Sequence, residues 1–280
     1  MTWLSTTGQP SQRNWTTVFT DHKDRRDHMD LKLKDRVAVV TGGGSGIGQG
    51  IARALAAEGC KLHIWDRDTS AAQETAQSLT ATGVIAQSAA VDVGDPSAVE
   101  RAFAETLARN GRLDILVNAA GVLSTGLVAD LPITEWQRIA QVNLAGVIYC
   151  VKAAIPVMKQ QRHGRIINIA SVSAMRGGGS VGNTLYGTTK AGVVALTMGL
   201  ARELGPFGIT ANALAPAVVD TAMTHTALTE DAKRRILERI PLGRLAQLSD
   251  IADIAAFLAS ERAGFITGAT IPVDGGILTT

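Results

Sequence analysis

Segments with the apolar pattern of buried strands alternate with helix-like segments along most of this chain. We expect strands at residues 37–40, 61–65, 84–91, 113–117, 165–169, 209–214 and 270–273. Helix-like segments, among them residues 51–59, 71–79 and 97–109, lie between them. Because parallel neighbours need a crossover connection, this alternation predicts an α/β fold with a doubly wound parallel sheet and helices on both faces.

A glycine-rich turn joins the first predicted strand to the first predicted helix. Residues 41–48 read Thr-Gly-Gly-Gly-Ser-Gly-Ile-Gly. Glycines let the backbone turn sharply and let a pyrophosphate come close, and the helix N-terminus offers that anion free N–H groups. A flexible turn is the alternative. The strand-to-helix context favours a dinucleotide-binding turn in a Rossmann-type sheet.

Asp66 ends the second predicted strand, about 24 positions after Gly42, near the distance expected of a ribose-binding carboxylate. A carboxylate accepts hydrogen bonds from the ribose hydroxyls of NAD and repels the 2′-phosphate of NADP. Arg67 beside it could bind that phosphate, and a helix N-cap is the other common use of aspartate. We expect NAD rather than NADP as the cofactor.

Tyr186 and Lys190 are four residues apart, which places both side chains on one face of a helix. An ammonium nearby favours the phenolate, so we expect the pKa of Tyr186 to lie below its usual value of about 10. Such a tyrosine can exchange a proton with an alcohol or a carbonyl near neutral pH. Taken alone, the pair is more often a coincidence on a surface helix. The glycine turn upstream favours the functional interpretation.

The composition is typical of a globular enzyme and gives no sign of a nucleic-acid-binding or membrane protein. A chain of 280 residues, 46% hydrophobic and 19% charged, can bury one large core, and its net charge of +2 gives no electrostatic reason to expect nucleic acid. No run of about 18 apolar residues predicts a membrane span. Cys60 and Cys150, in or beside apolar runs, predict reduced core thiols and a cytoplasmic location. No cluster of residues has metal-ligand spacing, so we expect no metal.

Residues 1–30 differ from the rest of the chain. Thr, Ser, Gln, Asn and alternating charges dominate there, without the apolar core of a secretory signal. We expect a disordered or loosely attached arm, with Met29 as a plausible shorter start. Residues 31–280 are then a single dinucleotide-binding catalytic domain.

Together these motifs resemble the short-chain dehydrogenase/reductase family over about residues 33–276. Residues 41–48 match its Thr-Gly-x-x-x-Gly-x-Gly motif and residues 274–276 its Asp-Gly-Gly signature. The resemblance implies a catalytic tetrad of Asn143, Ser171, Tyr186 and Lys190. It also implies cofactor contacts along the strand ends, from Gly42, Ser45, Gly46, Ile47, Gly48, Asp66, Asp92, Val93, Asn118, Tyr186, Lys190, Val219 and Thr221.

The chain departs from the family pattern twice. Ala217 stands where the family usually has glycine after its proline. Ser171 and Tyr186 are 15 residues apart, whereas 13 is usual for the family, a spacing that Ser173 would satisfy. We choose Ser171 because it follows directly on the end of a predicted strand. Ser173 is then a substrate-facing or supporting hydroxyl.

The resemblance implies hydride transfer between a nicotinamide cofactor and a secondary alcohol or ketone. Ser171 would bind the substrate oxygen and Tyr186 would carry the proton. Lys190 would lower the pKa of the tyrosine and hold the ribose. Asn143 would order a water that connects Lys190 to solvent; the alternative is a buried asparagine that satisfies backbone groups.

The substrate is less constrained. We expect a lid near residues 221–244, and Arg176 or His225 could contact a polar or anionic substrate. A sugar, polyol or hydroxy acid is favoured over a 3-oxoacyl thioester, a steroid or a xenobiotic ketone. A non-enzymatic dinucleotide sensor is the second class of function, and the presence of both Tyr186 and Lys190 argues against it.

We expect this small-molecule enzyme to be a homotetramer with two-fold symmetry. The resemblance supplies the number of subunits. Residues 191–200 form a predicted helix that is apolar on nearly every side, and residues 277–280 are too apolar for a free tail. Such surfaces need cover, which a partner subunit could provide.

Overall fold

The computed structural model describes residues 30–179, 181–221, 224 and 228–279. The expected arm, apart from residue 30, lies outside the described residues, and so does His225. From Leu31 onward the chain forms one compact unit around a single sheet.

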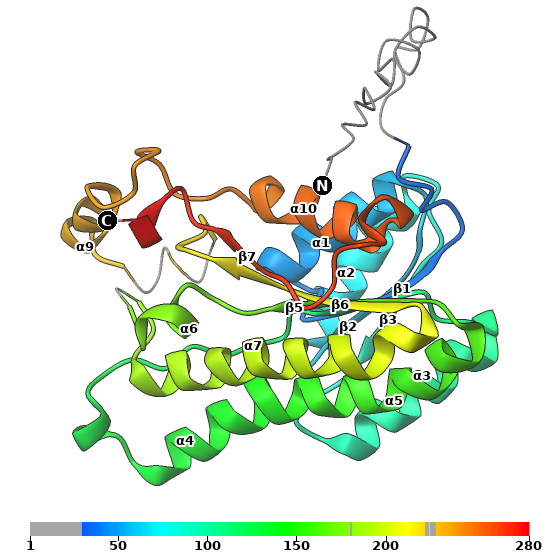
Figure 1. Ribbon diagram of the computed structural model, residues 1–280, viewed down its shortest axis with the longest axis horizontal. Coiled ribbons are helices and arrows are strands. Elements are labelled where there is room, and N and C mark those ends of the chain that lie inside the picture. The colour runs from blue at the N-terminus through cyan, green and yellow to red at the C-terminus, as the bar shows by residue number, and fades with distance from the viewer. Residues whose placement is uncertain (1–29, 180, 222–223, 225–227, 280) are drawn as a thin grey trace, which may run out of the picture. The chain divides into compact units, whose positions relative to one another are not determined.

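Seven parallel strands form the sheet, in the order β3-β2-β1-β4-β5-β6-β7 (Figure 1). Their bounds are β1 Val37–Thr41, β2 Lys61–Asp66, β3 Ala86–Ala90, β4 Ile115–Asn118, β5 Gly164–Ile169, β6 Ile209–Pro216 and β7 Thr270–Val273. The order reverses between β1 and β4, the point at which ligands of doubly wound sheets gather. The predicted fold class is confirmed.

Helices cover both faces of the sheet (Figure 1). One face packs against α1 (Gly46–Ala57), α2 (Thr69–Thr80) and α10 (Leu248–Ala259). The other packs against α3 (Pro96–Asn110), α5 (Gly146–Gln161) and α7 (Thr184–Leu204). A hydrophobic core lies on each face of the sheet, and successive strand residues pack into opposite cores, because side chains alternate across a strand. Val40 packs into the core with α1, α2 and α10, and Val39 packs into the core with α3, α5 and α7.

Shorter helical elements complete the described fold. They are η2 Val128–Asp130, α4 Ile133–Ala140, the π-helical η3 Gln141–Ala145, α6 Ser173–Arg176, η4 Gly205–Phe207, α9 Glu230–Leu237, η5 Glu261–Ala263 and η6 Ile277–Thr279. Several helices begin where the sequence supplies a cap: Asp68, Asp95, Asn183 and Thr229 each accept a hydrogen bond from a backbone N–H in the first turn of α2, α3, α7 and α9.

Among the described residues, one continuous helical stretch, Ile133–Gln161, is long and apolar enough to cross a membrane by length and composition alone. This is weak evidence, because core helices of soluble proteins meet the same criterion. Within this stretch α5 packs against the sheet, where Val147, Val151 and Met158 are buried.

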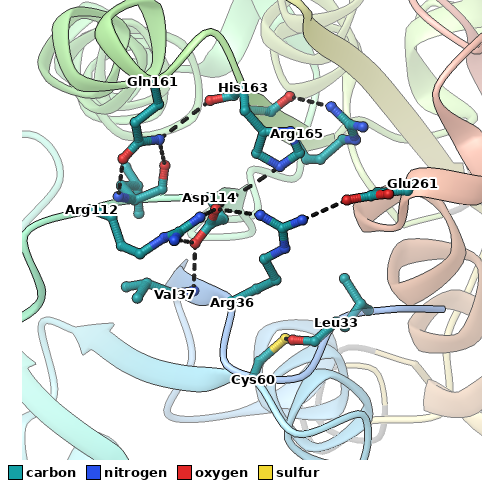
Figure 2. Close-up of polar contacts among 12 residues, drawn as sticks. Leu33, Arg36, Val37, Cys60, Arg112, Asp114, Gln161, His163, Arg165 and Glu261 are labelled. Atoms are coloured by element: carbon teal, nitrogen blue, oxygen red, sulfur yellow. Dashed lines mark hydrogen bonds and ion pairs between the residues drawn. The ribbon is translucent and has the colours of Figure 1, made fainter.

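The amino-terminal edge of the sheet is held together by Asp114, whose side chain is fully buried (Figure 2). Its carboxylate accepts hydrogen bonds from Arg112 Nε at 2.8 Å, Arg36 Nη1 at 3.2 Å and the Val37 N–H at 2.9 Å. Arg36 also donates to Glu261 at 2.6 Å. One carboxylate therefore joins the starts of β1 and β4, and Arg36 extends the link to η5.

Burial raises the pKa of Asp114, but the hydrogen bonds from Arg112 and the Val37 N–H and the charges of both arginines outweigh it. The pKa therefore lies below its usual value. A carboxyl whose pKa is lower in the folded state contributes stability that is complete above the unfolded pKa of about 4. That contribution is lost as the pH falls through the folded value.

We predict that Asp114→Asn lowers the free energy of unfolding by about 2–4 kcal/mol at pH 7, because two arginines lose their shared carboxylate. The control Asp231→Asn removes an exposed pair with Arg234 and should cost less than about 0.5 kcal/mol. Urea unfolding at pH 7 and pH 3 measures both. An Asp114→Asn effect of equal size at the two pH values would contradict the assignment.

Candidate active site

A cavity of about 600 Å³ opens at the carboxyl ends of the strands. Most residues predicted for the site line it: Gly42, Ser45, Gly46, Ile47, Gly48, Asp66, Asp92, Val93, Ser171, Tyr186, Lys190, Val219 and Thr221. Asn118 and Asn143 are buried and do not contribute to its wall. The structure therefore brings the motif residues together around one space.

The turn between β1 and α1 requires its glycines. Gly42 and Gly46 have φ angles of +64° and +51°, which side chains other than that of glycine rarely allow. A Cβ on Gly48 would lie 2.2 Å from the Gly42 carbonyl oxygen, so the helix can approach the turn only without a side chain there.

The N-terminus of α1 is built to receive an anion. Ser45 occupies the N-cap position, yet its side chain makes no capping hydrogen bond, unlike the caps of α2, α3, α7 and α9. The N–H groups of the first helical turn therefore lack this usual partner, and Gly46, Ile47 and Gly48 line the cavity. This arrangement fits the pyrophosphate of a dinucleotide.

The side chain of Asp66 accepts a hydrogen bond from the glycine-rich turn between β1 and α1. One carboxylate oxygen accepts the Gly44 N–H and the other accepts the Asp68 N–H, both at 3.0 Å. Asp66 and the exposed Arg67 line the cavity side by side. Asp92 is fixed in a similar way, because it accepts the Gly94 N–H at 2.8 Å. The carboxylates thus stand preoriented at this end of the cavity.

Ser171, Tyr186 and Lys190 line the same cavity. Ser171 Oγ accepts the Ser173 N–H at 3.1 Å. Lys190 Nζ donates to the Ile169 carbonyl at 2.7 Å and lies 5.8 Å from the centroid of the Tyr186 ring. Ser171 and Ser173 both line the cavity, and Ser171 remains our choice, because it is the serine that lowers the pKa of Tyr186.

Burial is the largest influence on the pKa values of Tyr186 and Lys190. It raises the pKa of Tyr186, and the hydrogen bond with Ser171 only partly offsets it. Burial also lowers the pKa of Lys190 to about 8. The expectation that Tyr186 would titrate below its usual value is therefore wrong for this structure, because removal from water outweighs an ammonium that is not in direct contact with the hydroxyl.

Asn143 lies in the π-helical segment η3, and its side chain is fully buried. Its Oδ1 accepts the Val122 N–H at 2.8 Å, and its Nδ2 donates to the Val122 carbonyl at 2.9 Å. A Cβ on Gly121 would lie 3.4 Å from Asn143 Oδ1 and 3.5 Å from Lys190 Nζ. Asn143 thus satisfies backbone groups and also lies near the lysine; π-helical turns are frequent at functional sites.

The side chain of Asn118 links the neighbouring strands β4 and β5 beneath the cavity. Its Nδ2 donates to Asn168 Oδ1 at 2.8 Å, and Asn168 Nδ2 donates to Thr197 at 2.9 Å. Beside it, Thr41 Oγ1 accepts two consecutive backbone N–H groups, those of Ala119 and Ala120. These bonds fix the course of the chain as it leaves β4 and turns toward the cavity.

The cavity wall also includes apolar side chains, and of these the sequence did not reveal Ile277. Val172, Val181 and Ile277 line it, and they belong to or pack on a small cluster with Ile236 and Ile240. These positions come from segments far apart in the sequence and follow no motif. Part of the expected lid, residues 222–223 and 225–227, lies outside the described residues.

A second hollow, of about 760 Å³, lies along the edge strand β3 between α2 and α3. It contains none of the motif residues. Its buried His63 is paired with Asn110, and burial lowers the pKa of this histidine to about 4. The candidate active site is therefore the cavity at the strand ends.

Comparison with known proteins agrees with this geometry. The adh_short_C2 sequence profile, described as enoyl-(acyl carrier protein) reductase, matches residues 42–278. The chain is 38% identical over 247 residues to 3-oxoacyl-[acyl-carrier-protein] reductase FabG of Escherichia coli (strain K12), covering 88% of this chain and 99% of that protein. It is 39% identical over 246 residues to meso-2,3-butanediol dehydrogenase of Serratia marcescens, covering 88% and 96%.

A crystal structure shows the same fold. It is that of a Sinorhizobium meliloti 1021 protein assigned as a short-chain alcohol dehydrogenase, with a TM-score of 0.85 and 37% identity over 89% of this chain and 99% of that one. The chain thus belongs to the short-chain dehydrogenase/reductase family and is an oxidoreductase that exchanges a hydride between a nicotinamide cofactor and a secondary alcohol or ketone.

Proposed function

We propose that this enzyme uses NAD and acts on a small polar substrate, with Asn143, Ser171, Tyr186 and Lys190 as its catalytic residues. One observation carries the proposal: Ser171, Tyr186 and the buried Lys190 line the same cavity as the first turn of α1, whose N-cap side chain makes no capping hydrogen bond. The other proposed cofactor contacts, apart from Asn118, are supported by their places on the cavity wall.

When bound, the nicotinamide cofactor supplies or accepts the hydride. Ser171 holds the substrate oxygen by a hydrogen bond. Tyr186 takes the proton of the alcohol in oxidation and returns it in reduction. Lys190 is protonated at neutral pH, since its pKa of about 8 lies above 7, and its positive charge favours the phenolate. Asn143 keeps the chain around Val122 in place beside the lysine.

We predict that Tyr186→Phe lowers kcat by at least about 10²-fold and leaves the Kd of NAD nearly unchanged, because only the proton carrier is lost. Lys190→Ala should lower kcat and also weaken NAD binding. The chain's other tyrosine gives a matched control, Tyr149→Phe, which should retain wild-type rates. Steady-state kinetics with calorimetry measures these quantities. Substantial turnover by Tyr186→Phe would disprove the assigned mechanism.

NAD preference is assigned to Asp66. We predict that Asp66→Ser narrows the ratio of kcat/KM for NAD and NADP by about tenfold or more, because the carboxylate no longer repels a 2′-phosphate. Asp66→Asn is the matched control for shape, since it keeps an oxygen for the Gly44 N–H while removing the charge. Better use of NADP by the wild-type enzyme would show that Arg67 governs this end of the cavity.

Two substrate classes are proposed. The cavity wall mixes apolar and polar side chains, which favours a sugar, polyol or hydroxy acid. A 3-oxoacyl thioester is the second candidate, because one relative carries that activity in its name. Identities of 38% and 39% do not separate that relative from the butanediol dehydrogenase. A panel of alcohols, ketones and thioesters assayed with both cofactors distinguishes the two classes.

The proposed location is the cytoplasm. Both cysteines are buried thiols, and burial raises the pKa of each to about 12, which keeps them protonated and unreactive. Cys60 donates to the Leu33 carbonyl at 3.4 Å (Figure 2). Neither is placed for a disulfide within the chain, as expected of a reducing compartment.

A homotetramer is proposed for the assembly. Much of the apolar surface of α7 is already used within the subunit, where Val193 and Leu200 are buried, and Ile277 is covered by the cluster beside the cavity. Exposed apolar side chains remain on α7, on α5 and before β7, at Met198, Ile148 and Phe265. These are candidates for subunit contacts.

Light scattering behind a sizing column should therefore give about four times the 29.3 kDa of one chain. The double substitution Ile148→Glu and Met198→Glu should reduce that mass, because charges would be buried without partners at the expected interface. A wild-type mass of one chain would contradict the proposal.

A further inference from the structure

Charge is divided unevenly along the cavity wall. Among the described residues that line it, the acidic ones are Asp66 and Asp92, which follow the strand ends on the adenosine side. The other charged residues that line it are cationic: Arg67 beside Asp66, and Arg138, Arg176 and Lys190. An anionic group on the substrate would therefore be attracted to the wall formed by Arg138, Arg176 and Lys190.

Two of these cations already have strong partners. Arg138 donates to both oxygens of Glu135 at 2.9 and 2.8 Å, and to the Leu123 carbonyl at 2.8 Å. Lys190 donates to the Ile169 carbonyl. Arg176 differs: within the described part of the chain its guanidinium has one contact, from Nη1 to the Ile277 carbonyl at 3.5 Å, and no carboxylate. A guanidinium has five donors, so most of them are free for a ligand.

The fold holds Arg176 close to the catalytic residues. It ends the four-residue helix α6, which begins two residues after Ser171, and the exposed Arg176 lines the same cavity as Ser171. The helix lies tight against the start of α7, because a Cβ on Gly187 would come within 2.6 Å of the Gly178 nitrogen and 2.8 Å of the Ser173 carbonyl oxygen. The apolar side chains of Val172 and Ile277 line the same part of the wall.

We propose that Arg176 binds the carboxylate of the substrate and makes the enzyme selective for hydroxy acids and their oxo acids. The carboxylate is separated from the reacting carbon by a short apolar spacer, which the wall around Val172 accommodates. The guanidinium fork matches a carboxylate in two parallel hydrogen bonds. A carrier phosphate would be the other source of an anion, but it ends a long pantetheine arm, whereas Arg176 lines the same cavity as Ser171 and follows it in the chain by five residues. This inference rests on the proposed function.

Four forms of one substrate test it: a 3-oxo acid, its methyl ester, its N-acetylcysteamine thioester and its coenzyme A thioester. The wild-type enzyme should reduce the acid with the highest kcat/KM. Arg176→Gln should lower kcat/KM for the acid at least about tenfold, through KM, and leave the ester unchanged. Arg176→Lys should restore part of the loss. The KM of the acid should rise with ionic strength.

Arg101→Gln is the matched control, because Arg101 on α3 is exposed like Arg176 but does not line the cavity. It should leave the kinetics of the acid and of the ester unchanged. Calorimetry with the corresponding saturated acid and the NAD-loaded enzyme gives a readout without turnover: binding should weaken in Arg176→Gln and persist in Arg101→Gln.

Several outcomes would overturn the inference. Equal losses on the acid and the ester would mean that Arg176 only tethers the Ile277 turn. A loss confined to the coenzyme A thioester would assign the arginine to a phosphate. Turnover of the neutral ester without preference for the acid would refute the inference and leave the proposed function standing. Absence of turnover for all forms, and for neutral alcohols and ketones, with either cofactor would refute both.

Discussion

Parallel pairing in register is the constraint on which the site depends. Thr41 is paired with both Trp65 and Asn118, and Asn118 is paired with Asn168, so the central strands end at one level. The segments that follow these strands are therefore neighbours, although they are far apart in the sequence. Hydrogen bonds across the strand ends, such as that from Asn118 to Asn168, maintain this alignment beneath the cavity.

The electrostatics of the cavity differ between the part near α1 and the part near α7. Near α1, uncapped N–H groups provide positive potential without a charged side chain, and Asp66 adds a carboxylate that is itself held by backbone donors. Near α7, two titratable groups are withdrawn from water together. Their pKa values move in opposite directions, upward for Tyr186 and downward for Lys190, because burial disfavours the charged form of each.

This has a consequence for the chemistry. A lysine whose pKa is about 8 is still protonated at neutral pH, but loses its charge more readily than an exposed one. The interaction with Ser171 offsets only part of the effect of burial on the pKa of Tyr186. A substrate or cofactor that excludes further water strengthens the attraction between an ammonium and a phenolate, because electrostatic effects grow as the local dielectric falls.

Much of the architecture was predictable from the sequence, because it depends on local patterns. Apolar runs and helix-like segments indicated the succession of strands and helices along the chain. The structure shifts the expected bounds only slightly: the strand expected at residues 113–117 is Ile115–Asn118. The spacing of Tyr186 and Lys190 indicated a shared helix face. The glycine turn was identifiable because positive φ angles and a close helix approach both require glycine.

Other features of the site depend on contacts between segments that are far apart in the sequence, and could not be predicted from local patterns. Counting residues left Ser171 and Ser173 as alternatives; both line the cavity, and Ser171 is the one that lowers the pKa of Tyr186. The direction of the tyrosine pKa was misjudged because spacing along a helix does not report burial. Arg176 and Ile277 come together over the cavity only in the folded chain. The sequence by itself determined the fold class and the motif residues, since these follow from local periodicity and backbone geometry; the tertiary structure decided burial and partners, because both depend on long-range packing.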